Sequence, residues 1–517
     1  MRSVTPIAAG AATCALALFF AAPSAAVAAS CESLTSLSLS NTTITLAQSV
    51  AAGAFTPQRK PYSLPLPASY KDLPAFCRVA VGVRPMKDSD IKFEIWMPAA
   101  GWNGKFVGVG NGGFSGEIWY WSMTEPLARG YAVASTDTGH EGAVMDGSFA
   151  AGHPEKWADF GWRAVHEMTV KSKAILAAFY GKGPRLAYWS GCSTGGRQGL
   201  MEAQRFPADY DGIVAGAPAN YMTHLSAQYL WVAQALHKEP GSFIPPAKLA
   251  VLHNAVVQAC DAKDGIKDGI LEDPARCDFD PKVVECQGAD GPTCLTAAQV
   301  EAARKIYSGS TNPRTKEVLY PGMMPGGELG WATGVGAVTP EPMPLATGIF
   351  KFVVFKDPNW DYKTYDFDRD SALADKADGG TTNAIDPNLK KFFDRGGKLL
   401  HYHGWTDPGI SPLNSINYYK SVADKLGGVS KVQEAYRLFM LPGMDHCQGG
   451  EGPDKFDGLG AMEQWVEGKK APARILASRV RNGKADRTRQ LCPYPQVAVY
   501  NGNGSTDEAA SFTCRAR

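Results

Sequence analysis

The stretch that decides the fold reads Tyr188-Trp189-Ser190-Gly191-Cys192-Ser193-Thr194-Gly195-Gly196-Arg197. Residues 186–189 form an apolar run typical of a short buried strand, and residues 197–206 can continue as a helix. The G-x-S-x-G pattern around Ser193 therefore has the strand–turn–helix setting of a nucleophile elbow. Glycine two residues either side of the serine avoids a Cβ clash where the turn brings backbone together. The same pattern recurs in ordinary Gly/Ser loops, so the rest of the chain has to decide.

Strand-like segments follow one another on both sides of the elbow. They are residues 80–83, 91–97, 105–109, 131–135, 212–217, 398–403 and 436–441. Apolar residues between positions 155 and 179 recur with helical spacing and predict an amphipathic helix before the elbow strand. This alternation predicts an α/β fold with a doubly wound, mostly parallel sheet.

The chain of 517 residues is too long for one ordinary core. Residues 1–28 are predicted to form a signal peptide. Residues 29–219 are predicted to form the first part of the α/β core. Within this part, residues 31–73 are expected to form an arm that Cys31 and Cys77 pin to the core. The strand pattern loosens over residues 220–385, which predict an inserted lid over the sheet's C-terminal edge, stapled by local disulfides. Residues 386–517 return to the core.

The N-terminus and the charge balance indicate where the chain works. Met1-Arg2, an apolar run over residues 7–22 and small residues at 26–28 predict a secretory signal cleaved near Ala28 or Ala29. Its apolar part is too short to span a membrane. The formal net charge of +1, without charged blocks, argues against nucleic-acid or anionic-membrane partners. We expect a secreted or periplasmic protein acting on a small molecule; the oligomeric state stays open.

The cysteines favour disulfide bonds. Of the eleven cysteines, Cys14 lies in the predicted signal, which leaves an even number for the mature chain. An even number in an exported protein favours disulfides over thiolate metal sites, and no C-x-x-C pair argues for zinc.

An elbow serine needs a base and a carboxylate that orients the base. In α/β-hydrolases these follow in the order Ser, Asp/Glu, His, on loops after late strands. Asp407 and His446 have that order and position. Cys192 precedes Ser193 and Cys447 follows His446, so the two cysteines fall within bonding range if serine and histidine meet. A Cys192–Cys447 bridge would clamp the base loop to the elbow.

Three other residues compete for these roles. His401 and His403 precede Asp407 and alternate along a strand, so at least one is expected to be a buried, hydrogen-bonded core histidine. A metal bound by this pair lacks further ligands at a familiar spacing. Asp445 is expected to cap the turn into the histidine loop.

The elbow, the segment Gly404-Trp405-Thr406-Asp407 and the segment Gly443-Met444-Asp445-His446-Cys447 together resemble the tannase and feruloyl esterase family. That family also includes the hydrolase of mono(hydroxyethyl) terephthalate. The resemblance extends over essentially the whole mature chain, including Trp102-Asn103-Gly104 and the residues from Ser135 to His140. It implies an α/β-hydrolase core with a lid, serine esterase chemistry and the Cys192–Cys447 bond. It also implies the pairs Cys31–Cys77, Cys260–Cys277, Cys286–Cys294 and Cys492–Cys514.

An acidic, glycine-punctuated loop lies in the predicted lid. Asp261, Asp264 and Asp268 could combine with backbone carbonyls to hold Ca²⁺, although the spacing is not that of an EF-hand. A solvated acidic turn is the alternative. The family resemblance implies a structural calcium here, with carbonyl ligands from Ile266 and Ile270.

The oxyanion donors are expected on two segments. Thr194 N–H follows the nucleophile, and Gly112 and Gly113 belong to a Gly-rich loop that can supply a second N–H. A tight turn with positive φ is the alternative for that loop. The context argues against a dinucleotide site, because no G-x-G-x-x-G leads into a clear helix with a later acidic partner.

These residues predict hydrolysis of an ester through an acyl-enzyme, with His446 as base. By the resemblance, the substrate is an aromatic acid ester, free or linked to plant polysaccharide; a feruloyl ester comes first, with galloyl and terephthaloyl esters behind. Ile410, Trp331, Phe355 and Trp360 are candidates for the pocket wall, with core packing as the alternative for each. An inactive carbohydrate- or wall-binding module on a hydrolase scaffold, and acyl transfer in place of hydrolysis, are the alternative functions.

Overall fold

A computed structural model describes residues 1–5, 30–63, 69–334 and 342–516 of the chain. The predicted signal peptide, apart from its first five residues, lies outside the described residues. Within the described ranges, no helix is both long and apolar enough to cross a membrane.

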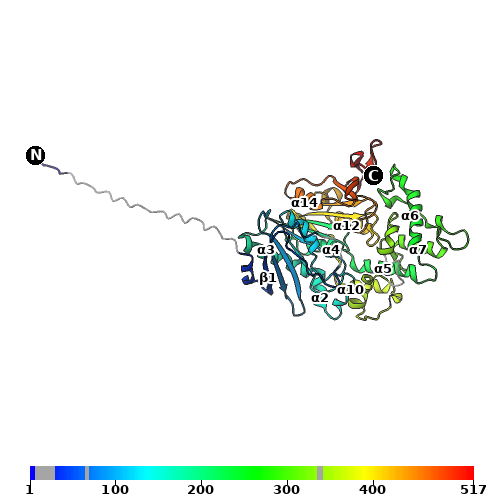
Figure 1. The fold of residues 1–517 in the computed structure, drawn as a ribbon, viewed down its shortest axis with the longest axis horizontal. Coiled ribbons are helices and arrows are strands. Elements are labelled where there is room, and N and C mark those ends of the chain that lie inside the picture. The colour runs from blue at the N-terminus through cyan, green and yellow to red at the C-terminus, as the bar shows by residue number, and fades with distance from the viewer. Residues whose placement is uncertain (6–29, 64–68, 335–341, 517) are drawn as a thin grey trace.

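A nine-stranded sheet forms the centre of the described structure (Figure 1). Its strands, in spatial order, are β1 (Thr42–Val50), β2 (Phe76–Val83), β3 (Ile91–Pro98), β5 (Ala132–Thr136), β4 (Lys105–Val109), β6 (Leu186–Cys192), β7 (Gly212–Gly216), β10 (Lys398–Gly404) and β11 (Tyr436–Leu441). The pairs from β5 through β11 are parallel, whereas β1, β2, β3 and β5 pair antiparallel. The sheet is therefore mostly parallel with an antiparallel extension at one edge.

Helices cover both faces of the sheet. One face packs on α3 (Ala164–Tyr180), α4 (Thr194–Arg205) and α12 (Pro412–Leu426), through residues such as Met168, Leu200 and Tyr419. The other face packs on α1 (Tyr120–Ala128) and α14 (Gly458–Val466), through Leu127 and Met462. This confirms the predicted doubly wound α/β fold, because the central strands are buried from both sides.

Two predicted elements differ from the structure. The segment expected as an arm pinned to the core contains β1, a partly buried edge strand that pairs with β2. The helix expected over residues 155–179 is α2 (Pro154–Ala158), a π-helical turn (Asp159–Arg163) and α3. At this turn Gly161 lies against Thr381, where a Cβ would stand 2.4 Å from the Thr381 carbonyl oxygen.

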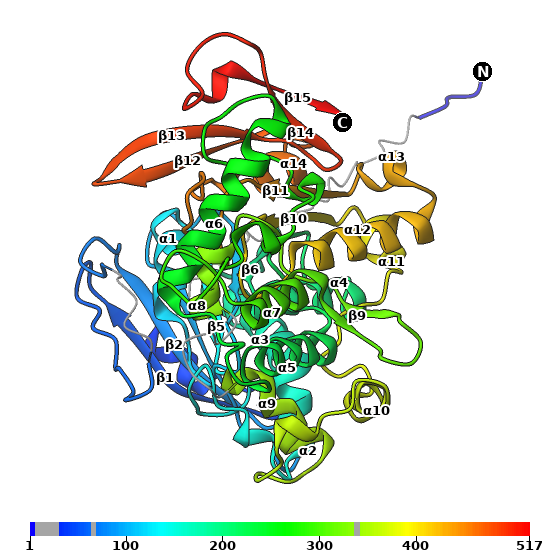
Figure 2. The same cartoon turned by 90° about the vertical axis from the view of Figure 1, so that its right-hand side faces the viewer.

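The chain between neighbouring strands β7 and β10 is mainly helical. It contains α5 (Met222–His237), α6 (Pro246–Cys260), α7 (Ala297–Ser308), α8 (Trp331–Gly334), α9 (Pro344–Ile349), α10 (Arg369–Asp378), α11 (Lys390–Asp394) and the short pair β8 (Ser310–Thr311) and β9 (Val318–Tyr320). Helices α5, α6 and α7 gather on one side of the molecule, in green in Figures 1 and 2. We call residues 220–385 the lid insertion.

The C-terminal part adds two hairpins that the sequence did not predict. After α13 (Val429–Val432), β11 and α14, the chain forms β12 (Ile475–Arg481) with β13 (Lys484–Leu491), and β14 (Gln496–Tyr500) with β15 (Phe512–Ala516). Both hairpins lie beyond the main sheet, at the top of Figure 2. Ile475 and Leu491 pack on the same core as α14.

The described residues contain five disulfide bonds, and each joins a predicted pair: Cys31–Cys77, Cys192–Cys447, Cys260–Cys277, Cys286–Cys294 and Cys492–Cys514. Two of them staple the lid insertion and one staples the last hairpin. Such disulfide density fits an oxidising compartment.

Candidate active site

Ser193 lies in the strained turn between β6 and α4. Its backbone has φ 63° and ψ −122°, a conformation rare for a residue with a Cβ. Ser193 N–H donates to the Gly216 carbonyl at 2.9 Å, which fixes the turn against β7. A Cβ on Gly191 would stand 2.7 Å from the carbonyl carbon of Gly195, so glycine is required where the turn closes. The elbow geometry therefore follows from the glycine spacing.

Asp407 holds His446. His446 Nδ1 donates to Asp407 Oδ2 at 2.7 Å, while the N–H groups of Gly409 and Ile410 donate to Oδ1 at 2.8 and 2.9 Å. Burial alone would raise the pKa of Asp407, but the His446 charge and the hydrogen bonds it accepts hold that pKa below its ordinary value. Burial likewise opposes the charged form of His446, yet the nearby Asp407 raises its pKa above the usual value.

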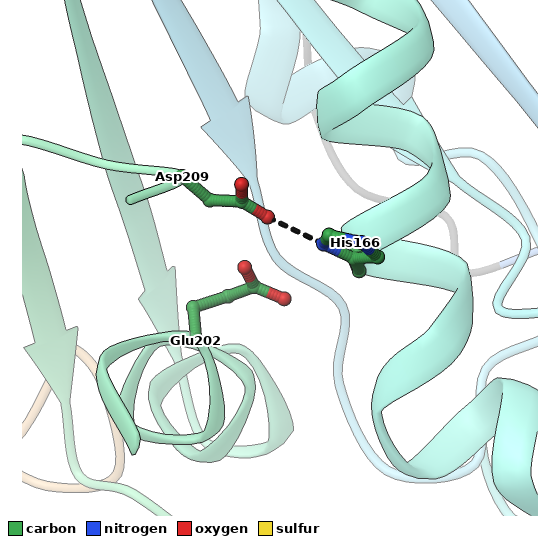
Figure 3. A group of neighbouring side chains, drawn as sticks. All are labelled: His166, Glu202 and Asp209. Atoms are coloured by element: carbon green, nitrogen blue, oxygen red, sulfur yellow. Dashed lines mark hydrogen bonds and ion pairs between the residues drawn. The ribbon is translucent and has the colours of Figure 1, made fainter. Parts of the chain in front are cut away.

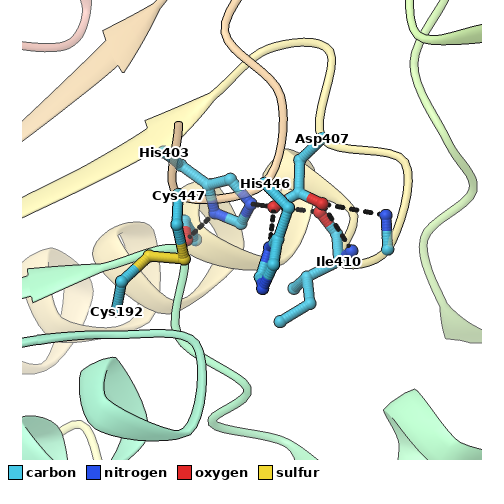
Figure 4. The surroundings of a disulfide bond; sticks show 8 residues. Cys192, His403, Asp407, Ile410, His446 and Cys447 are labelled. Carbon is cyan, nitrogen blue, oxygen red and sulfur yellow. Dashed lines mark hydrogen bonds and ion pairs between the residues drawn. A yellow bond between two sulfur atoms is a disulfide. The ribbon is translucent and has the colours of Figure 1, made fainter. Parts of the chain in front are cut away.

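A covalent clamp joins the two loops, as Figure 4 shows. The Cys192–Cys447 bond has a Cα–Cα distance of 5.9 Å and links residues 255 positions apart. Because each cysteine is adjacent to a predicted reacting residue, this bond fixes the base loop relative to the elbow. Ser193 and His446 both line one cavity.

That cavity has a volume of about 910 Å³. Its described wall comes from the core and from the lid insertion, which contributes Tyr229, Met343 and Leu345. Core residues add Trp119, Trp121 and Tyr402. The wall is therefore largely apolar and aromatic around a serine and a histidine, as in many small-molecule sites.

The predicted oxyanion segments meet beside Ser193. Gly112 and Gly113 line the cavity, and Thr194 Oγ1 donates to the Gly113 carbonyl at 2.8 Å, which ties the Gly-rich loop to the start of α4. Gly113 has φ +51°, and a Cβ there would stand 2.4 Å from the Val144 carbonyl oxygen. The loop thus is a tight turn with positive φ and also a wall of the site.

The four side chains predicted for the pocket wall are not among the described residues that line the cavity with Ser193. Ile410 and Trp331 are buried in cores of the lid insertion, and Phe355 and Trp360 stack on each other, with ring centroids 4.8 Å apart, against one of those cores. Aromatic content alone could not separate a core residue from a wall residue, because which face of each lid helix meets the cavity depends on tertiary packing.

A series of buried, hydrogen-bonded side chains leads away from Asp407. His403 Nε2 lies 3.1 Å from Asp407 Oδ2 and 3.0 Å from the Ile410 carbonyl oxygen. Both partners are acceptors, so Nε2 carries the proton. On the other side of the ring, His403 Nδ1 lies 2.6 Å from Ser415 Oγ.

The chain continues away from the site. Ser415 Oγ lies 2.8 Å from His401 Nε2, and His401 Nδ1 lies 2.7 Å from the Tyr436 hydroxyl. Burial lowers the pKa of His401 well below its ordinary value, so this ring is neutral. Both histidines are thus buried and hydrogen-bonded, where the sequence required only one. Sequence reasoning missed the contact of His403 with Asp407.

Asp445 has more contacts than a simple turn cap. Its Oδ1 accepts a hydrogen bond from Thr406 Oγ1 at 3.0 Å, and the residue lines the cavity. Burial raises the pKa of its carboxyl to about 6.

The acidic lid loop folds around its own backbone. Asp261 accepts hydrogen bonds from the N–H groups of Asp268 and Gly269, and Asp264 accepts from Ile266 and Glu272. The carboxylates of Asp261, Asp264 and Asp268 thus bond the loop's own backbone, and they are not among the groups of described residues whose ligand atoms lie within 4.8 Å of one another; the Ca²⁺ site stays a prediction.

The C-terminal hairpin contacts this loop. Arg489 Nη2 donates to Asp268 Oδ2 at 2.6 Å, and both side chains are about 1% exposed. An ion in the loop would share Asp268 with this guanidinium.

A parallel sheet with an elbow serine, a histidine on a late loop and a buried aspartate defines the α/β-hydrolase class with a serine nucleophile. Residues 77–515 match the model of the tannase and feruloyl esterase family. The chain belongs to this family and is a carboxylic ester hydrolase.

Individual relatives cover nearly the whole chain. An uncharacterized esterase of Xanthomonas campestris is 39% identical over 535 residues, covering 95% of this chain and 92% of the relative. Feruloyl esterase B of Aspergillus niger is 34% identical, covering 92% and 94%. The crystal structure of feruloyl esterase B from Aspergillus oryzae superposes with a TM-score of 0.87 at 33% identity, covering 94% of this chain and 99% of that one.

Proposed function

We propose that this protein hydrolyses esters of aromatic acids, feruloyl esters first, through an acyl-enzyme on Ser193. The observation that carries the proposal is the Cys192–Cys447 bond, which holds the loop of His446 against the elbow of Ser193. His446 is paired with Asp407, and both Ser193 and His446 line the same aromatic cavity. The similarity to proteins named feruloyl esterase B supports the choice of acid.

In the proposed mechanism, His446 acts first as a base and then as an acid. His446 removes the proton from Ser193 Oγ as the oxygen attacks the ester carbonyl, and Asp407 stabilises the imidazolium that forms. Main-chain N–H groups of Thr194 and of Gly112 or Gly113 hold the oxyanion. His446 then protonates the departing alcohol, and afterwards activates the water that releases the acid.

The charges on the cavity wall support the choice among aromatic acids. Within its described lining, the acidic and imidazole side chains are Glu125, Asp445 and His446, and there is no lysine or arginine. A terephthalate monoester carries a second carboxylate, which this wall would leave without a cation. Feruloyl esters are neutral at pH 7 and need none, and galloyl esters rank second.

A second cavity supports a place for the alcohol part of the ester. It has a volume of about 190 Å³ and shares Trp119 and Trp121 with the first cavity. Its lining includes the carboxylates of Glu117, Glu141 and Asp137 and the cations Arg59, Lys60 and Lys92. The Oδ2 atom of Asp137 is buried without a hydrogen-bond partner. Indole rings beside carboxylates suit a sugar, so an ester linked to plant polysaccharide would direct its sugar here.

Calcium in the lid loop is part of the same proposal. Asp261, Asp264 and Asp268 with the carbonyls of Ile266 and Ile270 would hold the ion, which would supply structural rigidity and no chemistry. We also propose that the protein is exported, which the five disulfides support. Neither its oligomeric state nor the choice between medium and periplasm enters the proposal.

The experiment compares the mature protein with Ser193→Ala on methyl ferulate, methyl gallate, mono(hydroxyethyl) terephthalate and a short aliphatic ester, by acid release. We expect methyl ferulate to be cleaved best and the variant to be folded and inactive. Equal activity of the variant would refute the elbow assignment. Faster cleavage of another ester would mean that its acid, and not ferulic acid, is the preferred acyl group. Formation of a new ester with an added alcohol would show acyl transfer.

A further inference from the structure

A cluster of three ionisable side chains lies at the end of α4 opposite the elbow. His166 belongs to α3, Glu202 to the last turn of α4, and Asp209 to the loop before β7 (Figure 3). One ligand atom from each residue, the imidazole nitrogen and two carboxylate oxygens, lies within 4.8 Å of the other two. Glu202 is eight residues along α4 from Thr194, about 12 Å from the elbow at 1.5 Å per residue.

Glu202 is the unusual member of the cluster. It is about 1% exposed, and neither of its carboxylate oxygens has a hydrogen-bond partner. A buried carboxylate without partners is costly, because its charge has lost its water. Figure 3 shows this carboxylate directed toward Asp209 and His166.

The other two residues are held in place. His166 Nδ1 lies 2.6 Å from Asp209 Oδ2, and the His166 ring stacks on Phe206 with centroids 3.8 Å apart. Lys173, the cation nearby, donates to the main-chain carbonyl oxygen of Asp209, which leaves both carboxylates available. The side chain of His166 is 29% exposed and gives the cluster a route to solvent.

We propose that His166, Glu202 and Asp209 bind one Zn²⁺ ion. One imidazole nitrogen and two carboxylate oxygens are ligands that zinc accepts, and water would complete a tetrahedron. Ca²⁺ and Mg²⁺ fit less well, because they require six or more oxygen ligands or near-octahedral geometry. The ion would replace the proton between His166 and Asp209 and give Glu202 its missing partner.

The role of such an ion would be structural. It would join α3, α4 and the loop before β7, and so anchor the far end of the helix that begins at Thr194. Because a ligand that binds only the folded state raises stability, zinc should raise the melting temperature.

The alternative for this cluster is a neutral Glu202. Burial, followed by the charge of Asp209, raises the pKa of Glu202 well above its ordinary value. A carboxyl that keeps its proton beside Asp209 needs no metal.

The test uses the mature protein stripped with a chelator and kept in excess Ca²⁺, so that oxygen-only sites stay filled. Zinc retained after gel filtration is measured by mass spectrometry, and Co²⁺ absorption reports the coordination. Variants Glu202→Gln and His166→Gln remove a ligand. His153→Gln is the matched control, because His153 pairs with Asp88 at 2.9 Å on the surface.

We expect wild type and His153→Gln to retain one equivalent of zinc and to melt at a higher temperature with it. Both ligand variants should bind zinc at least tenfold more weakly. Zinc retention by Glu202→Gln equal to that of wild type would overturn the proposal, as would a wild type that retains none. A metal-free Glu202→Gln that melts above wild type without a change in zinc retention would establish the neutral carboxyl instead.

Discussion

At the scale of single residues, the orientation of Asp407 depends on a histidine that never reaches the cavity. His403 is fully buried, donates to the same carboxylate oxygen as His446, and is held by Ser415. We therefore assign His403 a positioning role.

Replacing His403 by alanine should lower kcat/KM by about tenfold to a hundredfold, because a hydrogen bond to a charged group contributes about 1.5–3 kcal/mol. His403→Gln keeps an N–H donor and should recover part of the loss. Rates measured across pH test the role, since the pKa of His446 should fall when Asp407 is held less well. An unchanged pH profile in a folded His403→Ala would mean that the residue only fills space.

The pH dependence of the wild type follows from His446. Asp407 raises the pKa of the imidazole above its ordinary value of about 6.5. Only neutral His446 can accept the serine proton, so kcat/KM should fall as pH falls through that raised pKa. Asp407→Asn should move the acid midpoint downward and lower the plateau; a midpoint that stays fixed would exclude Asp407 as the cause.

The backbone conformation of Ser193 is expected to lower the free energy of unfolding. A positive φ on a residue with a Cβ costs on the order of 1 kcal/mol or more. Ser193→Gly should therefore raise the free energy of unfolding by about 1 kcal/mol while it abolishes activity. Ser193→Ala keeps the Cβ and serves as control in urea unfolding; equal stability of the two variants would show that the turn is not strained.

At the scale of elements, the disulfide beside the reacting residues joins the end of β6 to the loop after β11. Closing a loop of 255 residues would stabilise the chain by about 5 kcal/mol in the chain-entropy model. Its position also decides whether the base reaches the elbow.

Replacing Cys192 and Cys447 together by alanine should lower the melting temperature and reduce kcat/KM beyond the loss of folded protein. The matched control replaces Cys286 and Cys294, which close only an eight-residue separation in the lid insertion. Activity per folded molecule, measured below both melting temperatures, separates the effects. Full activity of the folded Cys192/Cys447 variant would show that packing alone positions His446.

At the scale of the whole molecule, the acidic lid loop and the C-terminal hairpins depend on each other. Arg489 donates to Asp268, and the Ala498 N–H donates to Glu272 at 3.0 Å. The loop therefore connects the lid insertion to the last part of the chain.

Removing Ca²⁺ with a chelator should lower the melting temperature by several degrees, because an ion bound only to the folded state stabilises it. The value of kcat well below that temperature should stay unchanged, since the loop is not in the cavity wall. Asp264→Asn should melt at the same temperature with or without calcium. A wild type indifferent to the chelator would favour the solvated acidic turn.

Much of this protein was predictable from local sequence. The elbow around Ser193, the order of Asp407 and His446, the parallel strands and the cysteine neighbours follow from glycine sterics, apolar periodicity and spacing, which act over a few residues. The edge strand β1 and the C-terminal hairpins were not predicted, because polar or charged residues fill many positions of these partly exposed strands.

Only the tertiary structure decided the rest. His403 lies within hydrogen-bond distance of Asp407, and Arg489 donates to Asp268. Tyr229 lines the cavity that holds Ser193. These positions depend on how the elements pack in three dimensions. The same holds for His166, Glu202 and Asp209, which come from two helices and a loop. The sequence by itself determined the local conformation and the order of the reacting groups; packing determined what surrounds them, because side-chain surroundings depend on which faces meet.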